Sequence, residues 1–350
     1  MLAELQLRNF RCFDALAVEF APGFNFFIAQ NGQGKTSILE AACVLLRLQS
    51  QRSSTLAPVV RFGEKAFGVS GRVMDHRLEF RYSALRRKVS LDGIEQRPLG
   101  EYLRLGRVVS FANTDIELVR GGSEARRRYL DFLGTQIDSL YRPTLRAYER
   151  ALRSRNALLK SAHPRPREIA AYDLPLIEHG TKLGVMRARL VERLAPLAGE
   201  AHRQVSASAE ESLRIRFAPG NGEDFAADLA NSHPKELRLR QTIVGPHRDD
   251  IELAVERKDA QQYASEGQQR TVALALKIAQ ARMFQLEEGT APLLLLDDIF
   301  GELDPGRRNA LLAHLPADAQ KLVTATTMQW RENHIAGPVF ELRERQLKAL

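Results

Sequence analysis

The segment Ala29-Gln-Asn-Gly-Gln-Gly-Lys-Thr36 follows an apolar run at 24–28 and precedes a stretch at 37–48 whose apolar residues fall on one helical face. A strand, a glycine-containing loop and a helix in this order predict a phosphate-binding loop. Backbone N–H groups can turn toward a phosphate at Gly32 and Gly34, while Lys35 would reach the β- and γ-phosphates. The predicted ATP-binding residues are Ala29, Gln30, Asn31, Gly32, Gln33, Gly34, Lys35, Thr36 and Ser37.

The first position of this loop departs from the usual pattern, because Ala29 stands where glycine is typical. If the turn needed a positive φ there, alanine would cost about 1 kcal/mol. A glycine-rich turn that merely ends in Lys-Thr is the alternative interpretation. The strand before the loop and the helix after it favour phosphate binding.

Two carboxylates end a second apolar run, Leu293-Leu-Leu-Leu-Asp-Asp298. Such a run predicts a buried parallel strand, and ligands of open α/β sheets bind at the carboxyl ends of these strands. Asp297 and the Thr36 hydroxyl are therefore the predicted Mg²⁺ ligands. Asp298 would orient or deprotonate the attacking water, so Lys35 and Asp298 are the predicted catalytic residues. A surface Asp-Asp cap on a core strand is the alternative.

A third segment, Ser265-Glu-Gly-Gln-Gln269, precedes another helical pattern. Ser265 and Gln268 have the spacing of a capping box, in which each side chain bonds the backbone N–H of the other residue. A helix N-terminus with a serine hydroxyl and a glycine amide also attracts anions. Ser265, Gly267 and Gln268 are thus candidate nucleotide contacts as well as a helix cap.

The rest of the chain alternates between strand-like and helical patterns. Short strands are predicted within 66–109, helices at 123–212 with a loop at 162–167 and a helix at 172–195, strands at 213–217 and 251–255, and a last strand at 321–326. One helical stripe is expected to bury Tyr141, Leu145, Tyr148, Leu152 and Leu159.

The composition places the 350-residue chain among ordinary globular proteins, with 44% hydrophobic and 27% charged residues. No apolar run approaches the ~18–20 residues of a membrane helix, and the charged N-terminal stretch lacks the apolar core of a signal peptide. Two cysteines are too few for a disulfide framework or a four-cysteine zinc site. A cytoplasmic protein without a membrane partner is expected.

The net charge of +8 is confined to one part of the chain, because residues 120–167 carry 12 basic and four acidic side chains. A local basic excess favours a lobe that binds a polyanion such as DNA. The alternative is that these arginines only solvate helix faces. The candidate DNA-binding residues are Arg126, Arg127, Arg128, Arg142, Arg146, Arg150 and Arg153.

Several motifs together resemble one family. They are Asn9-Phe-Arg11, the loop at 31–36, Arg126-Arg-Arg128 with Tyr129-Leu-Asp131, Arg155-Asn156, Gly245-Pro-His-Arg-Asp-Asp250, Ser265-Glu-Gly-Gln-Gln-Arg-Thr271 and Leu294-Leu-Leu-Asp-Asp298. The Ser265 segment resembles the signature motif of ABC-type ATPases, and Glu302-Leu-Asp304 resembles their D-loop. These motifs extend from residue 9 to about 304. Their sequences and their order resemble those of the RecF family of bacterial DNA replication and recombinational repair ATPases.

Two features depart from the RecF pattern, and a third departs from the pattern of ABC-type ATPases. Asn113 replaces a proline that the RecF family usually has, and Ala29 replaces the first glycine of the phosphate loop. The switch histidine of many ABC-type relatives is replaced by a threonine, Thr326 or Thr327.

The resemblance implies an α/β fold of the ABC/SMC type, a P-loop ATPase head with a helical insertion lobe and no long coiled coil. The ATPase lobe would comprise 1–115 and 240–350, and the basic helical lobe 116–239. It further implies an ATP-dependent homodimer on single- and double-stranded DNA at junctions or gaps, slow DNA-dependent ATP hydrolysis with Mg²⁺, and help in loading RecA with RecO and RecR during replication restart and repair of DNA damage, as part of the SOS response.

Three alternatives remain. A transporter ATPase would have a far shorter stretch between Lys35 and Ser265, and a small-molecule P-loop kinase would lack the Ser265 segment. The third alternative is a nucleotide-gated DNA clamp with negligible hydrolysis. ATP turnover with and without DNA would separate this clamp from an ATPase.

Overall fold

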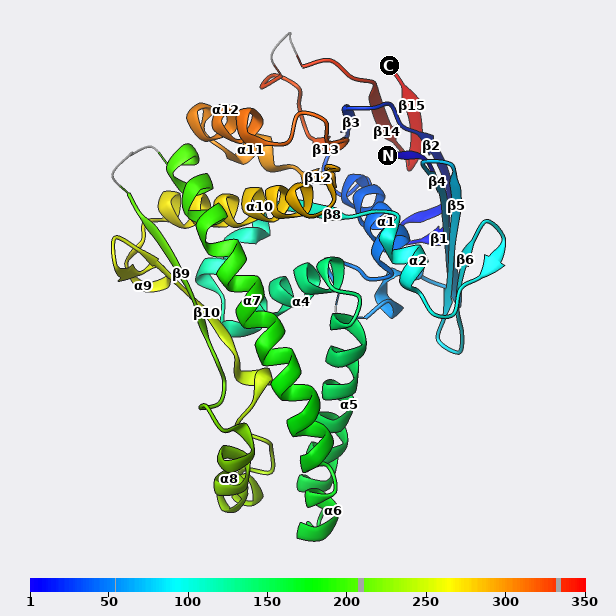
Figure 1. The fold of residues 1–350 in the computed structure, drawn as a ribbon. Coiled ribbons are helices and arrows are strands. Elements are labelled where there is room, and N and C mark those ends of the chain that lie inside the picture. The colour runs from blue at the N-terminus through cyan, green and yellow to red at the C-terminus, as the bar shows by residue number, and fades with distance from the viewer. Residues whose placement is uncertain (54, 207–210, 332–334) are drawn as a thin grey trace. The chain divides into compact units, whose positions relative to one another are not determined.

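The computed structural model describes residues 1–53, 55–206, 211–331 and 335–350. The chain divides into two compact units (Figure 1). Met1–Asp115 and Gln280–Leu350 form the first unit, and Ile116–Ala279 form the second. The second unit continues beyond residue 239, where the helical lobe was expected to end, because the strand at 250–255 pairs with the strand at 213–218.

A mainly parallel sheet is one layer of the first unit. Its strands, in spatial order, are β15 (Gln346–Ala349), β14 (Val339–Arg343), β3 (Phe24–Ile28), β13 (Lys321–Ala325), β12 (Leu293–Asp297) and β8 (Val108–Ala112). The four leucines of β12 are buried, as a continuous apolar run predicts. The prediction that 321–326 is the last strand was wrong, because β14 adds in parallel to the edge of β3 and β15 pairs with β14.

An antiparallel sheet forms the other layer of this unit. Its spatial order is β2 (Phe13–Glu19), β1 (Leu2–Phe10), β4 (Ala66–Val73), β5 (His76–Ser83), β6 (Arg87–Leu91) and β7 (Ile94–Glu95). Burial alternates along β4 and along residues 16–19 of β2, which is the pattern of strands with one face toward a core.

Helix α1 (Lys35–Arg47) contacts β1 and β4 of the antiparallel sheet as well as β12 and β13 of the parallel sheet (Figure 1). Its residues from Ser37 to Arg47 are buried, so the helix packs on all sides rather than on one face. The remaining helices that lie wholly in this unit are α2 (Gly100–Arg104), α11 (Ile299–Glu302), α12 (Pro305–His314) and the 3-10 turn η1 (Ala57–Val59). The phosphate loop is thereby fixed to the central helix of the unit.

The second unit combines helices with a small antiparallel sheet. Its helices are α3 (Glu117–Arg120), α4 (Ser123–Ile137), α5 (Tyr141–Leu159), α6 (Pro166–Ala170), α7 (Asp173–Val205), α8 (Phe225–Leu239), α9 (Ala260–Tyr263) and the first part of α10 (Glu266–Glu288), with the 3-10 turns η2 (Asn113–Ile116, at the boundary) and η3 (Pro246–Arg248). Its strands are ordered β11 (Lys258–Asp259), β10 (Asp250–Val255) and β9 (Leu213–Ala218).

Two helix predictions in this unit need correction. The helix predicted at 172–195 continues through Pro196 to Val205, since a buried face extends to that residue. The loop predicted at 162–167 ends early, because Pro166 begins α6, where the missing N–H of proline costs nothing. Residues 207–210 of the predicted helical span lie outside the described residues.

The buried stripe of α5 also differs from the prediction. Tyr141, Tyr148 and Leu159 are buried as expected, whereas Leu145 and Leu152 are only partly buried. Ala151 and Arg155 take the buried positions, because Arg155 forms ion pairs with Asp173 at 2.8 Å and Glu236 at 2.7 Å. A polar network therefore replaces part of the apolar stripe.

Across the described ranges, every helix is too short or too polar to span a bilayer.

Candidate functional site

The phosphate loop joins the carboxyl end of β3 to the first turn of α1. Gly32 and Gly34 have φ values of 81° and 109°, which residues with a side chain rarely adopt. A Cβ at Gly34 would also lie 2.7 Å from Sγ of Cys12 and 2.8 Å from the ring of Phe13. Position 34 therefore requires glycine both for its backbone conformation and for space.

Ala29 is accommodated without the strain that its position in the motif suggested. It is not among the residues with positive φ, and its N–H donates to the carbonyl of Ala325 at 3.3 Å. The cost of about 1 kcal/mol applies only to a positive φ, so it does not arise here.

The ammonium group of Lys35 is buried and bound on several sides. Nζ donates to the carbonyl of Ala29 at 2.6 Å and to Oδ1 of Asn31 at 3.5 Å. It also lies 3.3 Å from Oδ2 of Asp298. These contacts curl the loop around the ammonium group, which is the arrangement from which a loop lysine reaches phosphate oxygens.

Asp297 meets two threonine hydroxyls at the end of β12. Oγ1 of Thr36 and Oγ1 of Thr324 both donate to Oδ1 of Asp297 at 2.8 Å. Burial raises the pKa of Asp297, and the two hydrogen bonds oppose this shift. Because Mg²⁺ binds carboxylate and hydroxyl oxygens and takes other ligands from water and phosphates, Thr36 and Asp297 fit the predicted metal site.

Thr324 is a site residue that the sequence motifs do not identify; the threonines named from the sequence are Thr326 and Thr327. The parallel register of β12 and β13 places Thr324 opposite Asp297. Two neighbouring apolar strands carry no mark of their relative register in the sequence, so only the folded sheet identifies this partner.

Asp298 has a left-handed conformation with φ 51° and ψ 18° at the start of α11. Its N–H donates to Oγ1 of Thr324 at 2.9 Å, and its carbonyl accepts from Nδ2 of Asn113 at 3.4 Å. Asn113 thus replaces the usual proline with a side chain that contacts the site. Non-glycine residues in this conformation are uncommon and cluster at functional sites.

A cleft of about 720 Å³ lies beside the loop. From the predicted set, its lining includes Gln30, Asn31, Gly32, Gly34, Lys35, Thr36, Ser37 and Asp298. Ala29 and Gln33 are outside this lining. The volume is within the range of pockets that hold small ligands.

Arg11 also lines the cleft, and its side chain is held by Glu40, which belongs to none of the sequence motifs. Glu40 is buried in α1 and accepts hydrogen bonds from Nε and Nη2 of Arg11 at 2.8 and 2.6 Å. This contact raises the pKa of Arg11. The sequence does mark Glu40 as an acidic residue within an apolar helix. A charge buried in this way needs a partner, which predicts an ion pair.

The Ser265 segment forms the predicted capping box. The N–H of Ser265 donates to Oε1 of Gln268 at 2.8 Å, and the N–H of Gln268 donates to Oγ of Ser265 at 3.3 Å. Ser265 is exposed, and Gly267 is partly exposed at the N-terminus of α10. The serine hydroxyl at this helix end is therefore exposed.

The arginines predicted to bind DNA fall into two groups. Arg126 is buried, and its Nε and Nη2 lie 2.6 and 2.9 Å from the carboxylate oxygens of Asp250. Nη1 of Arg127 donates to the carbonyl of Asp249 at 2.8 Å. The exposed members are Arg128, Arg146, Arg150 and Arg153, with Arg142 partly exposed.

This division changes the expected role of Arg126. A guanidinium group held by a buried ion pair is not available to DNA phosphates, so Arg126 is better understood as a structural residue. Arg128 and Arg153 form long i,i+4 ion pairs of 3.6 Å with Glu124 and Glu149. Such exposed pairs are weak and leave the arginines able to contact phosphates.

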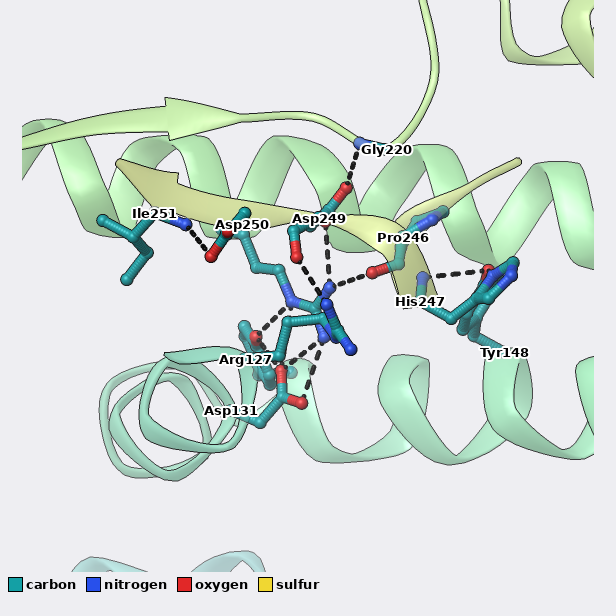
Figure 2. A network of polar contacts seen from close by, with 11 residues as sticks. Arg127, Asp131, Tyr148, Gly220, Pro246, His247, Asp249, Asp250 and Ile251 are labelled. Atoms are coloured by element: carbon teal, nitrogen blue, oxygen red, sulfur yellow. Dashed lines mark hydrogen bonds and ion pairs between the residues drawn. The ribbon is translucent and has the colours of Figure 1, made fainter. Parts of the chain in front are cut away.

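The Gly245–Asp250 motif belongs to a polar network of the second unit (Figure 2). Buried Arg187 donates through Nη1 to the carbonyl of Pro246 at 2.6 Å and to Oδ2 of Asp249 at 2.9 Å. Its Nη2 lies 2.8 Å from Oδ1 of Asp131. Asp249 also accepts from the N–H of Gly220 at 2.7 Å. The network ties α4 and α7 to the beginning of β10.

His247 is part of the same network (Figure 2). Its Nδ1 lies 2.7 Å from Oη of Tyr148, and its Nε2 lies 3.0 Å from the carbonyl of Thr242. Because the carbonyl oxygen of Thr242 can only accept a hydrogen bond, Nε2 carries the proton. Nδ1 is then the acceptor, and the hydroxyl of Tyr148 donates to it. Burial lowers the pKa of His247 to about 4. These bonds assign His247 a structural role as a neutral imidazole.

Comparison with known proteins agrees with this geometry. Residues 1–337 match the family model described as the RecF/RecN/SMC N terminal domain. The chain is 38% identical over 344 residues to the DNA replication and repair protein RecF of Symbiobacterium thermophilum, covering 94% of this chain and 92% of that protein. The RecF of Bacillus cytotoxicus is 34% identical over 349 residues, with coverage of 95% and 93%.

The chain belongs to the RecF family. Two solved structures of the recombination mediator protein RecF, described as its ATPrS and ATP forms in the RecFOR pathway, match with TM-scores of 0.89 and 0.88. They are 30% and 29% identical, and each match covers 100% of this chain and 98% or 97% of the other. The fold is that of an ABC/SMC-type ATPase head without a long coiled coil in the described residues, as predicted.

Proposed function

We propose that this chain is an ATP-dependent DNA-binding protein of recombinational repair and replication restart, and that it hydrolyses ATP slowly as a switch. The observation that carries the proposal is the meeting of Lys35, Thr36 and Asp298 beside the cleft, with Asp297 behind Thr36. The ATP-bound structures of RecF relatives support the choice of nucleotide.

The residues of this site take separate roles in the proposed reaction. Lys35 holds the β- and γ-phosphates, and the glycine amides of the loop contact the same oxygens. Thr36 and Asp297 would hold Mg²⁺, which would supply positive charge beside the phosphates. Asp298 orients the attacking water and accepts its proton.

A second copy of the chain completes the site in this proposal. The exposed N-terminus of α10 provides the Ser265 hydroxyl and the amides of Gly267 and Gln268. Their partial positive charge favours the γ-phosphate of ATP held by the other copy. ATP therefore drives dimerisation, and hydrolysis removes the group that joins the two copies.

DNA binding is assigned to the exposed arginines of the second unit. Phosphates on single or double strands at junctions or gaps would contact Arg128, Arg150 and Arg153, with Arg142 and Arg146 beside them. By family membership, RecR and RecO are the protein partners, and loading of RecA in the cytoplasm is the proposed outcome.

A nucleotide-gated DNA clamp with negligible hydrolysis is the second candidate. It is favoured by the 3.3 Å contact between Oδ2 of Asp298 and Nζ of Lys35, because a carboxylate held by the loop lysine is not directed at a water. Two measurements separate the ATPase from the clamp: steady-state ATP turnover with and without DNA, and sedimentation to detect the ATP-dependent dimer. Turnover that rises with DNA supports the ATPase, whereas ATP-dependent dimers without turnover support the clamp.

A further inference from the structure

Phe62 is a bulky aromatic residue at full exposure, 101% of its reference area, and it lines the same cleft as the phosphate loop. The preceding apolar residues of its segment behave differently, since Leu56 and Val59 are buried. An exposed phenylalanine at the wall of a cleft leaves a large apolar ring in water. Contact with a flat ligand would remove this apolar surface from water, which is favourable in free energy.

The backbone presents Phe62 on a fixed turn. The N–H of Glu64 donates to the carbonyl of Arg61 at 3.0 Å, and Gly63 has a φ of 87°. Positive φ at the third position is the signature of a type II turn, which places Phe62 at its second position. The N–H of Arg61 also donates to the carbonyl of Asn9 at 2.9 Å, so the turn is anchored to the end of β1.

Besides Arg11, Cys12, Arg52 and Asp298, the lining of the cleft contains loop residues and an apolar set. Gly32, Lys35 and Thr36 belong to the phosphate loop, whereas Pro58, Val60 and Phe62 are apolar. A nucleoside triphosphate has the same division between a charged tail and an apolar, flat base. The apolar group and the phosphate loop lie in one cleft, so one nucleotide is the occupant that accounts for both.

We propose that Phe62 is the stacking residue for the purine base of the bound nucleotide, an inference that rests on the proposed ATP site. The ring contacts the face of the base, and every purine has such a face, so Phe62 adds affinity without distinguishing adenine from guanine. The phosphate loop then supplies the interactions that depend on charge.

The test compares ATP with inorganic tripolyphosphate, which has the phosphates but lacks the base. Phe62→Ala is expected to weaken ATP binding about tenfold while changing tripolyphosphate binding less than about twofold. Leu85→Ala is the matched control, because Leu85 is an equally exposed apolar residue of the same unit at 100% exposure, outside the cleft lining. This control should change neither affinity.

A second variant gives a readout that does not depend on lost affinity. Phe62→Trp should show fluorescence quenching with ATP and GTP but none with tripolyphosphate, against the background of Trp330, which is buried. Equal weakening of ATP and tripolyphosphate in Phe62→Ala would overturn the inference, as would unchanged binding of both. If the wild-type chain binds neither ligand, the ATP site itself fails and this inference fails with it.

Discussion

Lys35 and Asp298 lie 263 positions apart in the sequence, yet Nζ of the lysine is 3.3 Å from Oδ2 of the aspartate. The lysine begins α1, and the aspartate follows β12 in a left-handed turn. The loop lysine and the proposed base are therefore brought into direct contact by the fold, although they come from opposite ends of the chain.

Asp298→Asn should remove turnover while sparing ATP binding. The amide retains the shape and hydrogen bonds of the carboxylate but cannot accept the proton, so kcat should fall about 10²- to 10⁴-fold. ATP-bound dimers should accumulate, which sedimentation would detect. Persistent turnover, or loss of the dimer together with hydrolysis, would contradict the role of Asp298.

Lys35→Ala should weaken ATP binding about 10- to 100-fold, because the phosphates lose a charged hydrogen-bond donor. ATP-dependent dimerisation and ATP-dependent DNA retention should disappear with it. Ala29→Gly is the matched control within the loop, and calorimetric titration should find its ATP affinity within about twofold of wild type, since Ala29 has no positive φ. Affinity of Lys35→Ala within about twofold of wild type would show that the loop is misassigned.

Replacing Arg146, Arg150 and Arg153 together by Glu should weaken DNA binding about equally across sequences. The log–log salt slope should fall by about 0.9 for each lost contact with a duplex phosphate. Binding would be measured by anisotropy over a range of salt concentrations. The charge-matched control replaces Arg8, Arg72 and Arg104 by Glu, which are exposed arginines of the first unit. Equal effects of the two triple variants would mean that only net charge matters.

Arg187→Met should lower the free energy of unfolding by about 3–5 kcal/mol, because Asp131 and Asp249 would lose their buried partner. Arg189→Met is the control, since Arg189 is exposed on the same helix. Denaturant titration of both variants, followed by circular dichroism, compares their midpoints. If the midpoint of Arg187→Met equals that of the control, the network does not contribute to the stability of this unit.

His247 should make stability depend on pH. Its pKa is about 4 in the folded protein and about 6.5 in the unfolded chain, so the unfolded chain binds more protons between these values. Stability should therefore fall as pH drops from about 6.5 toward 4, by at most about 3 kcal/mol from this residue. Urea midpoints at pH 7 and pH 5 should differ less for His247→Gln than for wild type. If the difference between the two midpoints is the same in His247→Gln as in wild type, His247 is not the titrating group.

The local features of this protein could be predicted from its amino-acid sequence. The loop at 29–36, the strand that ends in Asp297 and the capping box at Ser265 were all identifiable, because each depends on neighbouring residues: apolar runs, glycines and a spacing of three. The resemblance to the RecF family rested on the same short motifs, and it gave the fold class correctly.

The contacts between residues far apart in the chain could not be predicted from local patterns. Thr324 contacts Asp297 through strand register, Glu40 holds Arg11 from within α1, and Arg126 is buried against Asp250. An arginine in a basic run looks the same in sequence whether it faces DNA or an aspartate 124 positions away. Burial and partner choice are set by long-range packing, where charges must be paired when they leave water, and no local pattern records that pairing.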